Sequence, residues 1–555
     1  MSDRNLVELH RHQAERLGPR PALRYKRHGL YHDISWARYR ADALACAAAL
    51  IGAGIAPGDR VGLVSENRPE WLVADQGILA TGAVNVPPHA PLTAAQVEYQ
   101  LAHAGARWLF VSGREQLEKI RQVRGRLPEL RGVVVFDRGV ASADALPWDG
   151  FLQRGRQALG QTAGELDRRE QALQPEDLAT IIYTSGTTGN PKGVTLTHGN
   201  LLSNTVAVLA VFPIDPDAVM FSWLPYSHIY ARTVDYYLSI AAGTVLCLAE
   251  SADTVADNLG EVEPSHLSGV PRFYEKVLAS VAGADLQTTA QRLRDIFGPR
   301  IAWLGSGGAP LPLPVAEAYR QAGLLLLQGY GLTETSPVIT FNRKDRHKID
   351  TVGQPIPGVE VAIAPDGEVL TRGPHVMVGY WRNPAATAEA LRDGWLYTGD
   401  LGRLDADGFL TITGRKKDLL VLSNGKKVVP THIEGLLLAD PCIDQAAVYG
   451  EGRNFLTALI VPHGDNVRRA LHADGVSLNH EPDEALAGHP AVQGLIRRRV
   501  DAALGEVAGW EQVRKFLLLP RPFTVAAEEL TVSLKLRRNV VFAKYHDELA
   551  KLYRD

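Results

Sequence analysis

Cysteine is scarce in this sequence: 555 residues contain only Cys46, Cys247 and Cys442, far apart along the chain. Three distant thiols exclude a disulfide framework and lack the spacing of a metal site. This usage fits a reducing cytoplasm. Long apolar runs are missing too, since none approaches the ~18 residues that cross a bilayer. The alanine-rich stretch 41–56 comes nearest, but Asp42 and its short length predict a buried helix.

The first five residues carry charges where a signal peptide has an apolar core. A net charge of −3 gives no reason to expect a nucleic-acid partner. We therefore expect a cytoplasmic protein. Peripheral contact with the inner face of the membrane is left open, as is the choice between monomer and homodimer.

The length of 555 residues is too great for one hydrophobic core and predicts at least two domains. Helical and strand patterns alternate between residues 35 and 135: Trp36–Gly52 and Pro69–Thr81 are helical in pattern, and Arg60–Ser65 reads as a strand. This rhythm is typical of βαβ units in a largely parallel sheet. Residues 137–175 are polar and weakly patterned, which predicts a surface excursion.

A loop rich in glycine and hydroxyl groups follows the apolar run 177–182. Glycine lets the backbone approach a ligand closely, and hydroxyl and backbone N–H groups suit a polyphosphate. It is not a Walker A loop, because the spacing G-x-x-x-x-G-K-[ST] is absent. An ordinary Gly/Thr turn is the alternative. The candidate phosphate-binding residues are Thr184, Ser185, Gly186, Thr187, Thr188, Gly189 and Lys192.

This segment resembles the phosphate loop of the adenylate-forming (AMP-binding) superfamily, which includes acyl-CoA synthetases, firefly luciferase and peptide-synthetase adenylation domains. The resemblance covers most of the chain and is greatest to long-chain fatty acyl-CoA synthetases. It implies an α/β fold with a large adenylate-forming domain of mixed, largely parallel sheets, residues 1–416. A small mobile α+β domain, residues 417–555, would follow.

Two further glycine-rich turns, 304–310 and 328–335, match the family's nucleotide-binding motifs. The resemblance implies that Tyr330 stacks on adenine and that Glu334 and Thr184 bind Mg²⁺, for which hard oxygen ligands are suited. For Glu334 the alternative is a favourable charge at a helix N-terminus. The other residues implied to contact the nucleotide are Gly308, Ala309, Gln328, Gly329, Gly331 and Thr333.

His228 stands where the family places a histidine or an aromatic residue beside the reacting carboxylate; the alternative is a packed histidine. Asp400 follows Thr-Gly and resembles the aspartate that binds the ribose diol, together with Arg415. Lys417 falls at the family's hinge. Lys535 aligns with its catalytic lysine, although Val-Ser replaces the usual Pro-Thr two residues earlier.

The implied reaction activates a medium- or long-chain fatty acid with ATP and Mg²⁺, releases pyrophosphate, and transfers the acyl group to coenzyme A. Lys192, Glu334, His228 and Lys535 would be catalytic. An acyl-AMP ligase that serves a carrier protein is the alternative, but the compact segment 415–434 has no insertion that would block coenzyme A. A non-enzymatic nucleotide-binding protein is a third hypothesis.

Two residues near His228 bear on the substrate. Some long-chain enzymes gate the acyl tunnel with a tryptophan four residues after the histidine, where this chain has Arg232. Amino-acid adenylation domains hold the substrate amine with an aspartate in this region. Asp235 is the nearby candidate here, but its flanking pattern does not match.

Overall fold

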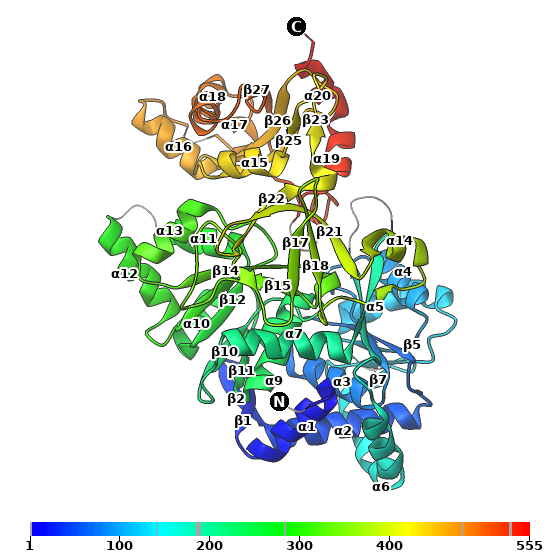
Figure 1. Ribbon diagram of the computed structural model, residues 1–555. Helices are drawn as coiled ribbons and strands as arrows, with labels where there is room; N and C mark the ends of the chain where they lie inside the picture. Colours follow the sequence, from blue (N-terminus) through cyan, green and yellow to red (C-terminus); the bar gives the residue numbers. More distant parts are fainter. Residues whose placement is uncertain are drawn as a thin grey trace. The chain divides into compact units, whose positions relative to one another are not determined.

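The computed structural model describes residues 3–140, 142–184, 190–281, 285–478, 481–531 and 535–554. The chain divides into two compact units (Figure 1). The large unit comprises Met1–Ala362, Leu370–Thr398 and Leu404–Thr411, and the small unit comprises Ile363–Val369, Gly399–Arg403 and Ile412–Asp555. The predicted boundary after residue 416 stays a prediction.

The first sheet of the large unit has eight strands in the order β19-β9-β8-β4-β3-β5-β6-β7. The strands from β8 to β7 are parallel, and β9 and β19 are antiparallel additions at one edge. The predicted βαβ rhythm is thereby confirmed. The elements are α2 (Trp36–Gly52), β3 (Arg60–Val64), α3 (Pro69–Ala80), β4 (Val84–Val86), α4 (Ala94–Ala104), β5 (Ala106–Val111), α5 (Arg114–Val123), β6 (Gly132–Val135), β7 (Leu146–Pro147), α6 (Trp148–Ala172), β8 (Leu178–Thr184), β9 (Lys192–Thr197) and β19 (Gly379–Tyr380).

Residues 137–175, expected as a weakly patterned surface excursion, contain α6, a helix of 25 residues that packs on α2. The two helices approach very closely: a Cβ atom at Gly155 would lie 1.8 Å from the carbonyl oxygen of Ala45. Glu170 adds an ion pair with Arg40 of α2 at 2.6 Å. The contact uses small and charged residues, which a search for apolar periodicity does not detect.

The second sheet has nine strands in the order β16-β15-β14-β13-β12-β10-β11-β1-β2, parallel from β14 to β1. Its strands are β1 (Pro21–Arg27), β2 (Leu30–Ser35), β10 (Val219–Ser222), β11 (Val245–Leu248), β12 (His266–Gly269), β13 (Trp303–Ser306), β14 (Leu326–Gly331), β15 (Val338–Phe341) and β16 (Gln354–Pro355). The accompanying helices are α1 (Leu6–Leu17), α7 (His198–Val211), α8 (Ile229–Ala231), α9 (Leu238–Ala242), α10 (Val255–Val262), α11 (Pro271–Val281), α12 (Leu286–Phe297) and α13 (Leu313–Gln321).

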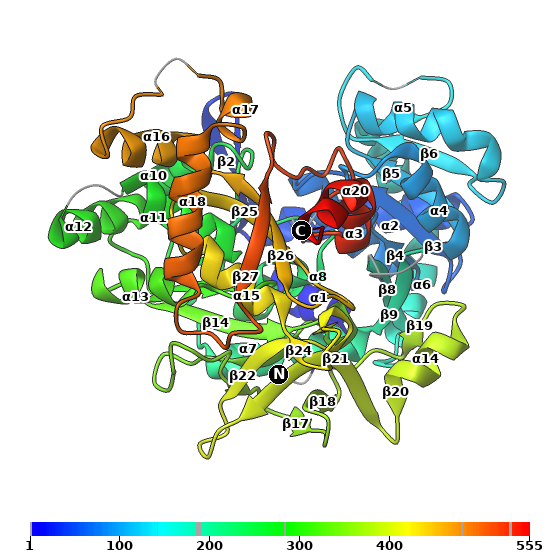
Figure 2. The same ribbon diagram turned by 90° about the horizontal axis from the view of Figure 1, so that it is seen from above.

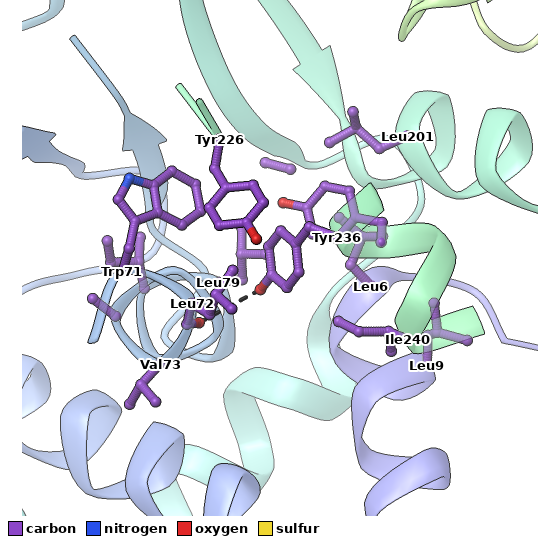
Figure 3. Packing of buried hydrophobic residues seen from close by; sticks show 14 of the residues in the cluster. Leu6, Leu9, Trp71, Leu72, Val73, Leu79, Leu201, Tyr226, Tyr236 and Ile240 are labelled. Atoms are coloured by element: carbon purple, nitrogen blue, oxygen red, sulfur yellow. Dashed lines mark hydrogen bonds between the residues drawn. The ribbon is translucent and has the colours of Figure 1, made fainter. Parts of the chain in front are cut away.

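An aromatic cluster lies between α3 and the helical segment that follows β10 (Figure 3). The Trp71 ring is 5.4 Å from Tyr226 and 6.1 Å from Tyr236, centroid to centroid. All three side chains are fully buried. Rings at these separations add attraction beyond the burial of their area, so this cluster joins the two sheets of the large unit.

A buried ion pair lies beside this cluster. Arg232 opens a π-helical turn, Arg232–Tyr237, between α8 and α9, and its guanidinium pairs with Asp75 of α3. Both side chains have no exposed surface. Arg232 also donates to the Thr180 hydroxyl at 2.8 Å and to the Tyr237 hydroxyl at 3.0 Å. The residue at the position of the family's gating tryptophan is therefore fixed inside the protein.

A third sheet contains β17 (Glu360–Ile363), β18 (Glu368–Arg372), β20 (Leu391–Arg392), β21 (Trp395–Leu404) and β22 (Leu410–Arg415), and its strands contribute residues to both units. The short connection 405–409 joins β21 and β22. The large unit also contains α14 (Pro384–Ala390).

The small unit has a three-stranded sheet, β25-β26-β27, with helices around it, which confirms the predicted α+β class. Pro490 begins the helix α18, and the His489 side chain caps it by accepting from the Ala491 N–H. Within the described residues, no helix combines the length and apolarity needed to cross a bilayer. The elements are β23 (Leu420–Val421), β24 (Lys427–Val428), α15 (Pro430–Leu438), β25 (Ile443–Tyr449), β26 (Leu456–Pro462), α16 (Gly464–Ala473), α17 (Asp483–Leu486), α18 (Pro490–Ala503), β27 (Val513–Leu518), α19 (Arg538–Lys544) and α20 (His546–Leu552).

Arg232→Met should destabilise the large unit strongly, because Asp75 would keep a buried charge without its cation. Removing one partner of such a pair typically costs about 3–5 kcal/mol. Thermal melting of the purified variant measures the loss. Adding Asp75→Asn to Arg232→Met removes the orphaned charge and should recover part of the melting temperature. An Arg232→Met protein that melts like the wild type would contradict this account.

Candidate active site

The predicted motifs of the large unit lie at the carboxyl ends of parallel strands. In the nine-stranded sheet, the His228 loop follows β10, the turn 304–310 includes the end of β13, and Gln328–Gly331 forms the end of β14. In the eight-stranded sheet, β8 ends at Thr184. Ligands of α/β proteins bind at this edge of a sheet.

Hydrogen bonds tie these two edges together. Asn67, just after β3, donates to the Leu224 carbonyl at 2.7 Å and accepts from the Tyr226 N–H at 3.0 Å. His89, in the loop after β4, lies 2.6 Å from the Ser227 hydroxyl through Nδ1. The loop that carries His228 is thus held by the loops that follow β3 and β4 of the other sheet. The motifs at the carboxyl edges of the two sheets therefore lie next to each other.

His228 caps α8, because its Nδ1 accepts from the Tyr230 N–H at 3.2 Å. In the neutral ring the proton is therefore on Nε2. The His89 ring stacks against it with centroids 6.3 Å apart. Burial lowers the pKa of His89 to about 4, so this imidazole is uncharged at neutral pH. His89 was not among the predicted residues, and its setting among prolines gave no signal for it.

Thr184 and Lys192 face each other across the β8–β9 hairpin. The predicted residues between them lie outside the described part of the chain: Ser185, Gly186, Thr187, Thr188 and Gly189. Lys192 lies over the ring of Tyr380, 4.9 Å from its centroid, and the Tyr380 hydroxyl donates to Glu334 Oε1 at 2.8 Å. The structure therefore brings Thr184, Lys192 and Glu334 together through a tyrosine that the sequence analysis missed.

The glycines of the adenine motifs are required by packing. A Cβ atom at Gly329 would lie 2.4 Å from the Phe341 ring, and one at Gly331 would lie 1.8 Å from the Pro337 carbonyl oxygen. One at Gly307 would lie 3.1 Å from the Tyr230 ring. These positions cannot hold a larger residue while β15 and Tyr230 keep their places.

The remaining adenine-motif residues surround these glycines. Gly308 has φ +81°, a conformation that favours glycine, and Ala309 beside it is exposed. Gln328 braces the two turns, since its Oε1 accepts from the Leu311 N–H at 3.2 Å and its Nε2 donates to the Ile349 carbonyl at 3.1 Å. Tyr330 is half-buried, and Thr333 begins the 3₁₀ turn Thr333–Thr335 that carries Glu334.

Two predicted ribose ligands lie in the small unit. Asp400 is buried, and its Oδ1 is 2.9 Å from Nε of Arg415, whose side chain is 42% exposed. Asp400 follows Gly399, which has φ +73°. Lys417, the predicted hinge, is exposed in the single 3₁₀ turn Lys416–Asp418.

Lys535 lies in a short hairpin in which Leu530 and Leu536 form an antiparallel bridge. Residues 532–534, which contain the Val-Ser departure, lie outside the described residues. Thr531 N–H donates to the Lys535 carbonyl at 2.8 Å, and the Thr531 hydroxyl accepts from Lys535 N–H at 3.0 Å. Glu529, which has no exposed surface, anchors the hairpin through ion pairs with Arg521 at 3.0 Å and Lys544 at 2.9 Å. Lys544 thus supports the hairpin that holds Lys535.

Asp235 is unsuited to hold a substrate amine. It is 1% exposed, and its Oδ2 accepts from the Ser222 hydroxyl at 2.8 Å. Burial raises its pKa to about 7. A carboxyl that is enclosed and readily protonated argues against an amino-acid substrate.

A cavity of about 580 Å³ lies elsewhere in the large unit, beside α2, α3 and α6. None of the described motif residues lines it. Its walls include several ion-paired side chains, such as Arg68 with Asp137 and Arg156 with Asp42. Cavity size therefore does not mark the candidate site.

The fold, the convergence of the motifs and the comparison with known families agree. The chain belongs to the AMP-binding enzyme family, whose model matches residues 10–381. A second model, the AMP-binding enzyme C-terminal domain, matches residues 417–555. The predicted membership of the adenylate-forming superfamily is confirmed.

Among curated proteins, the long-chain-fatty-acid–CoA ligase FadD15 of Mycobacterium bovis is 34% identical over 95% of this chain and 93% of its own length. The peroxisomal long chain acyl-CoA synthetase 7 of Arabidopsis thaliana is 28% identical over 96% of this chain and 83% of its own. Among solved structures, the anthranilate CoA ligase AuaEII in complex with anthranoyl-AMP has a TM-score of 0.80 at 22% identity, with 98% of each chain covered. This last similarity shows a shared fold.

Asp235→Asn should stabilise the protein at alkaline pH, with a gain that shrinks as the pH falls. The folded carboxyl, with its pKa raised to about 7, holds its proton at pH values where an unfolded aspartate has lost it. Wild-type stability is therefore lost as the pH rises from about 4 through about 7, whereas Asn cannot ionise. Melting curves of both proteins from about pH 5 to about pH 9 measure the difference. A difference that does not vary with pH would contradict the assignment.

Proposed function

We propose that this protein is an ATP-dependent fatty acid–CoA ligase that activates a medium- or long-chain fatty acid as its acyl-adenylate and then forms acyl-CoA. The observation that carries the proposal is the convergence of Thr184, Lys192, Glu334 and His228 at the joined carboxyl edges of two sheets. The long-chain specificity is supported by the relatives named above. The Asp235 side chain is buried and hydrogen-bonded, which is evidence against an amino acid as the substrate.

In the adenylation step, a fatty acid carboxylate oxygen attacks the α-phosphorus of ATP and pyrophosphate leaves. Negative charge on the phosphate oxygens must be stabilised by positioned cations. Lys192, half-buried at the start of β9, supplies one charge beside the phosphate loop. Lys535 of the small unit supplies a second. The Nε2–H of His228 is a hydrogen-bond donor for the substrate carboxylate.

The donor set fits Mg²⁺. The Glu334 carboxylate and the Thr184 hydroxyl are hard oxygen ligands, and Mg²⁺ commonly takes one or two protein ligands together with substrate phosphates. When bound, the ion neutralises phosphate charge. Glu334 is held for this role by the Tyr380 hydroxyl.

In this proposal, Tyr330 and the turns 307–309 and 328–333 would bind the adenine. Asp400 and Arg415 would bind the ribose hydroxyls. The Asp400 carboxylate is already oriented by Arg415. In the second step, the thiolate of coenzyme A attacks the acyl-adenylate carbonyl and AMP leaves. Lys417 is the proposed hinge for the change between the two steps.

The acceptor separates this proposal from its alternative, an acyl-AMP ligase that serves a carrier protein. Pyrophosphate release should be measured over a panel of fatty acids of increasing chain length, with and without coenzyme A, and acyl-CoA should be quantified in the same samples. The proposal expects acyl-CoA and repeated turnover with coenzyme A. A burst of pyrophosphate without acyl-CoA would support the alternative, and no pyrophosphate with any acid would overturn both.

Lys535→Ala should slow adenylation by about 10²–10³ while sparing thioester formation from supplied acyl-adenylate, because phosphate charge develops only in the first step. Pyrophosphate release and acyl-CoA formation from synthetic acyl-adenylate are measured on the same preparation. Glu529→Gln keeps Lys535 but weakens the anchor of its hairpin, so adenylation should fall in the same direction by less. An equal loss in both steps for Lys535→Ala would show that the lysine acts elsewhere.

A further inference from the structure

Tyr380 is placed by backbone pairing rather than by chance packing. It lies on β19, which pairs antiparallel with β9, the strand that Lys192 begins (Figure 2). The Trp381 N–H donates to the Gly193 carbonyl at 2.7 Å on one side of it. On the other side, the Met377 N–H donates to the Glu334 carbonyl at 2.9 Å. One short segment therefore connects the strand of Lys192 with the segment of Glu334.

The Tyr380 side chain contacts both proposed catalytic charges. Its ring lies under the Lys192 ammonium at 4.9 Å, and its hydroxyl donates to Glu334 Oε1 at 2.8 Å. Within the described structure, no ion pair joins Lys192 to Glu334.

The same three residue types behave differently elsewhere in the large unit. Lys26 lies 5.7 Å from the Tyr31 ring, and the Tyr31 hydroxyl donates to Glu261 at 2.8 Å. There the lysine also pairs directly with the glutamate, with Nζ 2.6 Å from Oε1. At this second site, the lysine and the glutamate that contact one tyrosine also pair directly with each other, as their mutual attraction predicts.

We propose that Tyr380 is a positioning residue that keeps Lys192 and Glu334 from pairing with each other, so that the lysine stays available for the ATP phosphates and the carboxylate for Mg²⁺. The proposal rests on the proposed ATP-dependent function. Cation–π contact holds Lys192 more weakly than a phosphate would, so the lysine is released when the nucleotide binds. The hydroxyl orients Glu334 as outer partners orient metal ligands generally.

The two contacts can be separated by substitution. Tyr380→Phe removes the hydroxyl but keeps the ring under Lys192. Tyr380→Leu keeps apolar bulk but removes both contacts, which lets Lys192 and Glu334 pair. Glu334→Gln in the Tyr380→Leu background removes the charge that captures the lysine. Tyr31→Phe and Tyr31→Leu are matched controls, because Tyr31 makes the same two kinds of contact.

Binding is measured by titration calorimetry without fatty acid, so that ATP is not consumed, once with Mg²⁺ and once with a chelator. Tyr380→Phe should weaken binding of Mg²⁺-ATP by about 10-fold, the usual effect of losing a partner of a metal ligand, and leave Mg²⁺-free ATP unchanged. Tyr380→Leu should weaken both. Adding Glu334→Gln should restore Mg²⁺-free ATP binding to Tyr380→Leu. The Tyr31 variants should bind as the wild type does.

Wild-type affinities for both nucleotide forms in Tyr380→Leu would overturn the proposal. Equally weak Mg²⁺-free ATP binding with and without Glu334→Gln would overturn it too, since capture by Glu334 would then not be the cause. If Tyr380→Leu does not melt cooperatively, Tyr380→Phe decides, and an unchanged Mg²⁺-ATP affinity there counts against the proposal. Pyrophosphate release by the wild type tests the proposed function separately from these affinities.

Discussion

Arg232 and Asp75 form an ion pair with no exposed surface, and this pair crosses from one sheet of the large unit to the other. Arg232 follows the His228 loop of the nine-stranded sheet, and it donates to Thr180 of β8, four residues before Thr184. A buried pair is costly unless its geometry is well satisfied, and here Tyr237 adds a further hydrogen bond. It therefore fixes the distance between the segments that carry His228 and Thr184.

The two charged residues Lys192 and Glu334 of the candidate site differ from these structural ion pairs. The ion pairs that shape the fold, such as Arg232 with Asp75, satisfy each other and leave nothing for a ligand. Lys192 and Glu334 instead both contact Tyr380, so neither charge neutralises the other. A site for a polyanion and its metal ion needs a lysine and a carboxylate that do not pair with each other, because an internal ion pair would have to be separated before binding.

In the small unit, one carboxylate joins α15 to the segment that contains Lys535. Glu434 of α15 accepts from both terminal nitrogens of Arg538 at 2.6 Å. It also accepts from the Val448 N–H at 2.7 Å. Arg538 lies three residues after Lys535. The bidentate pair between Arg538 and Glu434 therefore keeps the segment of Lys535 in a fixed position relative to α15 within the small unit.

The sequence by itself determined the βαβ rhythm, the order of the motifs, the family and the helix starts, such as the capping box of Thr197 and Asn200. These depend on local periodicity and capping. Only the tertiary structure decided that α6 packs on α2, that Arg232 is buried, and that Tyr380 joins Lys192 to Glu334. Each of these depends on which strands and helices become neighbours, and pairing between distant segments leaves no periodic mark in the chain.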